Sequence, residues 1–104
     1  MTGEITFDEL LKRSTEIVQL MDKKRGVAHD NQLTVVHLAE ELGEVARQVF
    51  NESSKRNALD KENMAEEIVD CLILLSHLAN INNLDVKKAF EKKLAVLRER
   101  AQKL

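Results

Sequence analysis

Apolar residues recur at helical spacing along this chain of 104 residues, and proline, which interrupts helices, is absent from its sequence. Glycine, the other residue that weakens a helix, occurs only at Gly3, Gly26 and Gly43. The apolar pattern does not show the alternation that is typical of strands. We therefore expect an all-α fold, organised as a single domain over residues 1–104 because this length is typical of one domain.

The first two predicted helices have recognisable ends. A capping box that begins at Thr6 starts the first helix, which should end near Gly26. Its apolar face consists of Phe7, Leu10, Leu11, Ile17, Val18 and Met21. The second helix should begin after Asp30 or Asn31 and run to about Phe50. We expect its acidic residues to lie opposite a buried apolar face made of Val35, Leu38, Leu42, Val45, Ala46 and Val49.

The second half of the chain predicts two more helices. Residues 51–59 are polar and small enough for a connecting loop, and Asp60 is a suitable cap for the third helix. This helix is apolar on nearly all sides over residues 71–81, as expected of a helix surrounded by others. A turn over residues 82–85 leads into a fourth helix with the inner face Val86, Phe90, Leu94, Leu97 and Ala101. Four helices with short connections predict a bundle that a second chain completes.

The composition excludes several classes of function. With 16 Lys and Arg against 18 Asp and Glu, the formal net charge is −2, which disfavours binding to a nucleic acid polymer. No apolar run approaches the roughly 20 residues needed to cross a membrane, and the N-terminus does not resemble a signal peptide. The only cysteine, Cys71, rules out an internal disulfide. The sequence therefore predicts a soluble, cytoplasmic protein.

Two acidic clusters stand out within the predicted helices. The second helix carries Glu40, Glu41 and Glu44, and the third carries Glu67 and Asp70. Residues three or four positions apart share one face of a helix, so each cluster presents its carboxylates together. Taken alone, the first cluster fits a solvated helix face as well as it fits a binding site.

The position of the second cluster requires a physical explanation, because Glu67 and Asp70 are in line with the apolar residues Leu74, Leu78 and Ile81, which we expect to be buried. A buried carboxylate without a partner costs several kcal/mol. A buried ion pair with a cation of the fourth helix is one explanation. A divalent metal ion is the other, and we favour it because it relieves the repulsion between two carboxylates one turn apart.

The type of ligand indicates which metal. An all-oxygen site suits Mg²⁺, with Mn²⁺ as a substitute, whereas zinc and di-iron sites usually recruit histidine or thiolate. The Glu-x-x-His motif of di-iron bundles is missing from the sequence. Mg²⁺ held by a few carboxylates keeps positions open for water and for substrate phosphates. The acidic clusters therefore point to phosphate chemistry.

Together the two clusters fill the signature Glu-Glu-x-x-Glu, spacer, Glu-x-x-Asp, and the chain resembles the MazG-like, all-α nucleoside triphosphate pyrophosphohydrolases over most of its length. The Asn-Leu-Asp turn and the basic last helix also fall where that family has them. The resemblance implies a four-helix MazG-like bundle completed by homo-oligomerisation, as a homodimer or homotetramer. It also implies Mg²⁺-dependent hydrolysis of (deoxy)nucleoside triphosphates between the α and β phosphates, which releases a nucleoside monophosphate and pyrophosphate and clears unwanted nucleotides.

The same resemblance assigns roles to the acidic residues. Glu41, Glu44, Glu67 and Asp70 would bind the metal. Glu40 would be catalytic, because it would hold a second ion or orient the attacking water.

For the substrate, Lys93 and Arg100 best match the family's phosphate-binding lysine and arginine. Leu97 stands between them where the family often has asparagine, which is a departure from its pattern. His29, in the loop before the second helix, is a further candidate for substrate contact. His37 lies one turn before the first acidic cluster, which suits either the border of the site or an ordinary surface position.

A second hypothesis comes from another class of protein. The same acids could bind a structural cation or a basic partner in a helical interaction module without catalytic activity. The complete acidic set combined with a basic helix favours the enzyme, because a scaffold has little reason to combine the two.

Overall fold

The computed structural model describes residues 3–53 and 59–104. Over these residues the chain forms four helices and no strand, which confirms the all-α prediction. In chain order they are α1 (Phe7–Arg25), α2 (Asn31–Ser53), α3 (Lys61–Ile81) and α4 (Val86–Gln102). None of the helices in the described part is long and apolar enough to cross a lipid bilayer.

Local capping interactions fix the ends of the helices. Thr6 and Glu9 form the predicted capping box of α1, and Gly26 ends that helix in the left-handed conformation at φ 70°. Asp60 and Asp85 cap α3 and α4, because each side chain accepts a hydrogen bond from the backbone N–H three residues on. These boundaries were predictable because each depends only on neighbouring residues.

The connection between α2 and α3 differs in part from the prediction. Residues 51–53 were predicted as loop but continue α2 as helix. Residues 54–58 of the predicted loop lie outside the described part of the chain, and Leu59 is outside any helix, as predicted.

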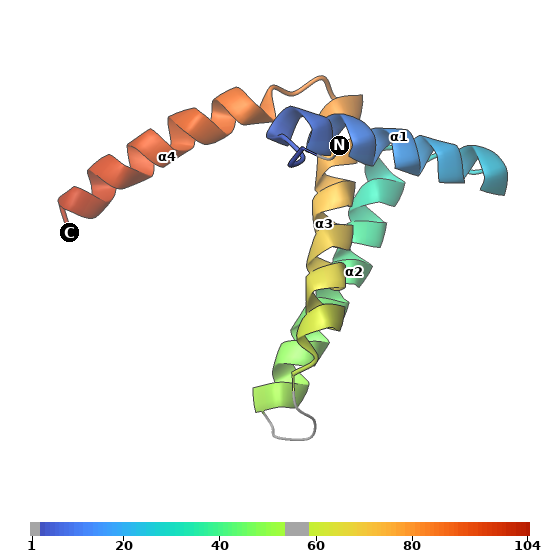
Figure 1. Ribbon diagram of the computed structural model, residues 1–104, viewed down its shortest axis with the longest axis horizontal. Coiled ribbons are helices and arrows are strands. Elements are labelled where there is room, and N and C mark those ends of the chain that lie inside the picture. The colour runs from blue at the N-terminus through green and yellow to red at the C-terminus, as the bar shows by residue number, and fades with distance from the viewer. Residues whose placement is uncertain (1–2, 54–58) are drawn as a thin grey trace.

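The packing centres on α3. Helices α2 and α3 lie side by side and run in opposite directions, while α1 crosses them near the C-terminal end of α3 (Figure 1). Among the described residues few apolar side chains are buried, namely Val18, Leu74 and Ala79. Polar side chains are buried with them, and the hydroxyls of Ser14 and Ser76 donate to backbone carbonyls one turn earlier in their own helices. The interior of this chain is therefore small and partly polar.

The orientation of α2 corrects one prediction. The apolar face expected to be buried is largely exposed, since Val35, Leu42 and Val49 are 50%, 58% and 46% accessible. Its acidic face, with Glu41 and Glu44 half-buried, is turned toward α3 instead. The apolar pattern marks a face that avoids water, but it does not determine whether that face packs within its own chain.

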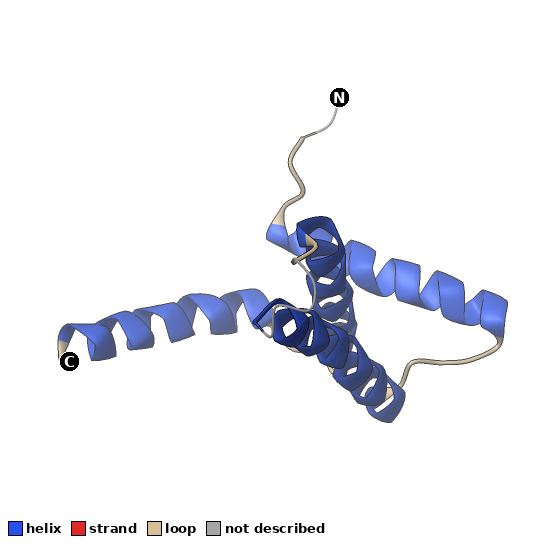
Figure 2. Cartoon of the chain, turned by 90° about the horizontal axis from the view of Figure 1, so that it is seen from below, coloured by secondary structure: helices blue, strands red, loops and turns tan. Residues whose placement is uncertain are grey.

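Helix α4 corrects a second prediction. It projects away from the other three helices, on the side opposite to the free end of α1 (Figures 1 and 2). None of its residues is buried, and Phe90, Leu94 and Leu97 of its expected inner face are exposed. Its contacts with α1 include Phe90 stacked on Phe7 at a centroid distance of 6.2 Å. One chain therefore does not form a closed four-helix bundle.

Candidate metal centre and adjoining pocket

Three carboxylates meet where the acidic faces of α2 and α3 oppose each other. Glu41 of α2 and Glu67 and Asp70 of α3 each place one carboxylate oxygen so that these atoms all lie within 4.8 Å of one another. Glu67 and Asp70 share a face because they are three residues apart on a helix. The antiparallel packing of α2 on α3 brings Glu41 to them, so three acids from the two helices form one group.

The proximity of these acids raises the pKa of two of them. The pKa of Glu67 is raised first by a side-chain hydrogen bond to Glu41, which only the protonated acid can donate, and then by desolvation and by neighbouring negative charges. The pKa of Asp70 is raised mainly by desolvation and then by the charge of Glu41. The cluster as it stands therefore favours the uptake of positive charge, from protons or from a cation.

The degree of burial departs from the sequence interpretation. The alignment with Leu74 suggested buried carboxylates, but Asp70 is exposed and Glu67 is half-buried. Within the described residues neither of them forms an ion pair, so the predicted alternative of an ion pair with α4 is not formed in this chain. Neighbouring negative charges, with Glu41 first among them, raise the pKa of both residues, and for Asp70 the attraction of His37 opposes this effect in part.

The other two acids of the predicted set lie differently. Glu44 is half-buried and pairs with Arg47 of its own helix at 3.0 Å. Glu40 is exposed and does not belong to the group of three carboxylates. The fold thus brings together Glu41, Glu67 and Asp70, and leaves Glu40 and Glu44 beside them on α2.

The donor set fits a hard divalent cation. All three side chains offer carboxylate oxygens, the ligands that Mg²⁺ and Mn²⁺ prefer. Mg²⁺ binds oxygen at 2.0–2.1 Å, so oxygens on opposite sides of the ion are about 4.2 Å apart. Since the three oxygens already lie within 4.8 Å, small side-chain movements suffice to bind the ion.

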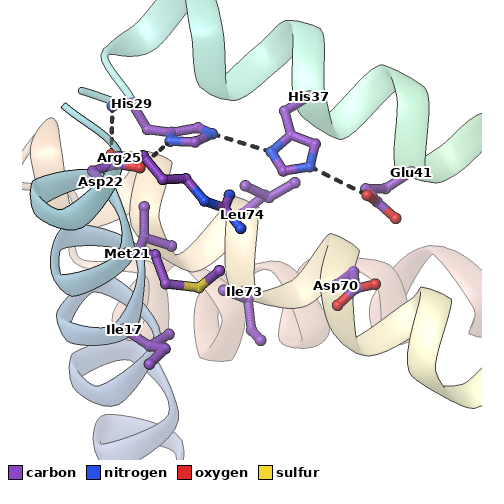
Figure 3. Close-up of a pocket in the computed structure, with 11 residues that line it drawn as sticks. Ile17, Met21, Asp22, Arg25, His29, His37, Glu41, Asp70, Ile73 and Leu74 are labelled. Atoms are coloured by element: carbon purple, nitrogen blue, oxygen red, sulfur yellow. Dashed lines mark hydrogen bonds and ion pairs between the residues drawn. The ribbon is translucent and has the colours of Figure 1, made fainter. Parts of the chain in front are cut away.

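A pocket of about 330 Å³ opens beside the carboxylates, between α1, α2 and α3 (Figure 3). Glu41 and Asp70 line its acidic side. The rest of the wall consists of apolar and polar side chains, namely Ile17, Val18, Met21, Ile73 and Leu74 together with Asp22, Arg25, His29 and His37. A cavity of this size with apolar side chains and a few polar groups in its wall is typical of a ligand site.

A chain of hydrogen bonds runs along the wall of this pocket (Figure 3). The carboxylate of Asp22 accepts from both the backbone N–H and the ring Nδ1 of His29, at 2.7 Å each. His29 Nε2 lies 3.1 Å from His37 Nδ1, and His37 Nε2 lies 3.2 Å from Glu41 Oε1. His37 therefore borders the acidic cluster, which was one of the two positions that its place in the sequence left open.

Asp22 contrasts electrostatically with the cluster at the other end of this chain. Burial alone raises its pKa, but the hydrogen bonds from His29 and the attraction of His29 and His77 outweigh that effect. The pKa of Asp22 is consequently held below its usual value, and the buried carboxylate is charged and fully paired.

The fold does not bring the predicted substrate-binding residues to one place within a single chain. His29 lines the pocket, but both of its ring nitrogens are engaged with Asp22 and His37. Lys93 lines a different, apolar groove between α1, α3 and α4, and Arg100 lies in the last turn of α4.

Sequence reasoning missed two polar residues of the pocket. Arg25 lines the pocket, and its side chain extends over it toward Leu74 and His37 (Figure 3). In the sequence it is one of three basic residues in the last turn of α1, which an ordinary helix terminus also explains. Asp22 gave no signal either, because its pairing with His29 depends on the loop after Gly26.

The comparison with known families agrees with this geometry. The sequence profile of the MazG nucleotide pyrophosphohydrolase domain matches residues 29–104, which include all three clustered carboxylates. No curated protein and no solved structure is significantly similar to the chain. Because the matched span covers well over half of the sequence, this chain belongs to the MazG nucleotide pyrophosphohydrolase family.

Proposed function

We propose that this chain hydrolyses (deoxy)nucleoside triphosphates between the α and β phosphates, with Mg²⁺ as the metal and Mn²⁺ as a substitute. The products are a nucleoside monophosphate and pyrophosphate, and the role in the cell is clearance of unwanted nucleotides in the cytoplasm. The observation that carries the proposal is the meeting of Glu41, Glu67 and Asp70 beside a pocket. The family to which the chain belongs supports the same chemistry.

In this proposal the acidic residues hold the metal and the water. Glu41, Glu67 and Asp70 bind Mg²⁺, joined by Glu44 once its side chain leaves Arg47. Bound Mg²⁺ supplies positive charge that neutralises the phosphate oxygens. Glu40, which is exposed at the edge of the cluster, orients the attacking water or holds a second ion. The contribution of the chain is thus positioning and charge, as in other phosphoryl transfers.

The pocket accommodates the rest of the nucleotide. The apolar side chains of its wall suit the base, while its acidic side, where Glu41 and Asp70 lie, suits the metal-bound phosphates. Arg25 supplies positive charge there for the substrate, in addition to Lys93 and Arg100. His29 contributes mainly through the shape of the wall, because its ring nitrogens are engaged with Asp22 and His37.

The working form in this proposal is a homodimer or homotetramer of a single domain, residues 1–104. The exposed apolar residues of α2 and α4 support it, because patches of this kind mark contact surfaces. Association would also bring the Lys93 and Arg100 of one chain near the acids of another.

The experiment that tests this function is an assay of pyrophosphate release from canonical and modified nucleoside triphosphates, with Mg²⁺ and with EDTA. Glu67→Gln and Asp70→Asn remove the negative charge with little change of shape, and Glu62→Gln is a matched control on the exposed first turn of α3. We expect metal-dependent release that falls by about a hundredfold or more in both cluster variants, the loss typical when a group that stabilises transition-state charge is removed. The control should retain native activity.

Two outcomes would overturn the proposal. Folded native protein that releases no pyrophosphate from any triphosphate would favour the helical interaction module. Release that is insensitive to EDTA and to the cluster variants would locate the activity elsewhere or in a contaminant.

For Arg25, the expected result of Arg25→Gln is a KM raised by about tenfold with kcat little changed, because the arginine contributes binding outside the reacting atoms. Lys24→Gln, a neighbouring basic residue that does not line the pocket, is the control. An unchanged KM in the arginine variant would remove Arg25 from the proposed substrate contacts.

A further inference from the structure

Glu41 is held differently from the other two carboxylates of the cluster. The charges that shift the pKa values of Glu67 and Asp70 are those of neighbouring acids and, for Asp70, also that of His37. Glu41 is in contact with His37, whose Nε2 lies 3.2 Å from Glu41 Oε1. Since an ionised carboxylate only accepts hydrogen bonds, His37 is the donor in this contact.

His37 is in turn held from the other side of its ring. Its Nδ1 lies 3.1 Å from Nε2 of His29, so the ring is in contact with a neighbour at both of its nitrogens. The two rings are tilted by 36° at a centroid distance of 5.3 Å. A histidine on α2 with one end free could rotate about its side-chain bonds, whereas the hydrogen bond to Glu41 and the contact with the His29 ring restrict this one.

His29 is anchored to the other two helices of the packing. Its backbone N–H and ring Nδ1 both donate to the buried Asp22 of α1. Its carbonyl oxygen accepts from Nε2 of His77 on α3 at 2.8 Å, and the other ring nitrogen of His77 lies 2.6 Å from the Thr15 hydroxyl. The contacts that begin at Glu41 therefore end in buried groups of α1 and α3.

Resting on the function proposed above, we propose that His37 is a positioning residue that holds the Glu41 carboxylate in place for the metal, with His29 and Asp22 as its anchor. The hydrogen bond restricts Glu41 to orientations that leave its second oxygen directed away from His37. This lowers the entropy lost when the metal binds. Glu41 is only 22% exposed at its side chain, so the contact is partly shielded from water.

The test measures Mn²⁺ affinity by electron paramagnetic resonance, in His37→Leu, His37→Gln and native protein. The leucine keeps bulk and helix propensity but removes the donor, while the glutamine side-chain amide restores an N–H at a similar reach. Gln32→Leu is the control, because it makes the same kind of change at an exposed position of α2. Urea unfolding without metal is measured for each variant, so that loss of folding is detected separately.

We expect His37→Leu to weaken Mn²⁺ binding by about tenfold, the lower end of the range for residues that orient metal ligands. His37→Gln should recover most of this loss, and the control should bind as the native protein does. In the pyrophosphate assay, the Mg²⁺ activation curve of His37→Leu should shift by the same factor, about tenfold, while kcat at saturating Mg²⁺ recovers. A merely structural role would lower stability without this recovery.

The results that overturn the inference are distinct from those that overturn the function. Native-like Mn²⁺ affinity in folded His37→Leu, or equal losses in the leucine and glutamine variants, would refute the positioning role and leave the metal site intact. Native protein that binds no Mn²⁺ would remove the metal site itself, and the positioning role with it.

Discussion

Asp22 and Glu67 are both carboxylates in the packing of α1, α2 and α3, yet the fold shifts their pKa values in opposite directions. Asp22 is buried, and the hydrogen bonds and charge of His29 lower its pKa. Glu67 is half-buried, and its hydrogen bond to Glu41, together with the neighbouring acids, raises its pKa. At one end of the pocket the chain itself supplies the partner of the carboxylate, because His29 pairs with Asp22. At the other end the repulsion among Glu41, Glu67 and Asp70 calls for a bound proton or metal ion. Carboxylates whose pKa values are shifted by burial and by neighbouring charges are typical of functional sites.

The largest loss of stability is expected from Asp22→Ala, at the end of the pocket where His29 pairs with the carboxylate. The substitution leaves the backbone N–H and ring Nδ1 of His29 without their acceptor in a buried place. We expect a loss of about 3 kcal/mol in the free energy of unfolding, measured by urea denaturation without metal. Glu16→Ala, an exposed acid on the same helix, should change it by less than about 0.5 kcal/mol. Equal losses of stability from the two substitutions would show that the pairing of Asp22 with His29 does not stabilise the fold.

A metal ion bound by the clustered carboxylates should stabilise the folded protein. A ligand that binds only the folded protein adds about 2.7 kcal/mol at a concentration 100 times its dissociation constant. We expect this gain with Mg²⁺ in native protein, as a shift of the urea midpoint, and its loss in the Glu67→Gln and Asp70→Asn double variant. A gain that survives in the double variant would mean that the cation binds elsewhere.

The pH dependence of the metal-free protein should separate the two ends. Asp22 has a lowered pKa, so it contributes stability above its usual value of 3.8 and loses it as the pH falls through the folded value. Glu67 and Asp70 have raised pKa values, so their contribution is present below the usual values of 4.5 and 3.8 and is lost as the pH rises through the folded ones.

Above pH 4.5, native protein should therefore lose stability relative to the Glu67→Gln and Asp70→Asn double variant as the pH rises. Saturating Mg²⁺ should abolish this relative loss. The measurement is the free energy of unfolding across the acidic range, with and without metal. Parallel profiles for the two metal-free proteins would show that the acids of the cluster do not interact as described.

The smallest effect concerns the backbone of the acidic end. Gly43 lies between Glu41 and Glu44 in α2, and a Cβ built on it meets no atom within 4 Å. Gly43→Ala should stabilise the chain by about 0.5–1 kcal/mol, the usual cost of a glycine within a helix, without changing Mn²⁺ affinity. A destabilised variant would reveal that another surface, such as a second copy, approaches this position closely.

The sequence was informative where the determinants are local. The caps at Thr6 and Asp60 and the helix end at Gly26 were predicted because each involves residues within one turn. The predicted group of acids was informative for a related reason, since spacing on a helix fixes which side chains share a face. The sequence alone did not establish which face of α2 meets α3, because the apolar side was expected to pack within the chain and is exposed instead.

The remaining features depend on contacts between distant residues. The contact of His77 with the backbone of His29 joins residues 48 positions apart, and no periodic pattern in the sequence predicts it. The placement of α4 away from the other helices could not be inferred either, because its amphipathic pattern is equally typical of a helix packed in its own chain. Asp22 and Arg25 became candidates only when the packing of α1 on α3 placed them at the pocket.

The most direct test of the central claim is anomalous X-ray diffraction from crystals grown or soaked with Mn²⁺. We expect an anomalous peak between Glu41, Glu67 and Asp70, at about 2.1–2.2 Å from one oxygen of each, close to the Mg²⁺ distance. The same peak should be absent from crystals of Glu67→Gln. A fully occupied Mn²⁺ ion bound away from these three carboxylates would contradict the proposed site. The absence of any bound Mn²⁺ from crystals of protein that hydrolyses nucleotides with Mn²⁺ would contradict it as well.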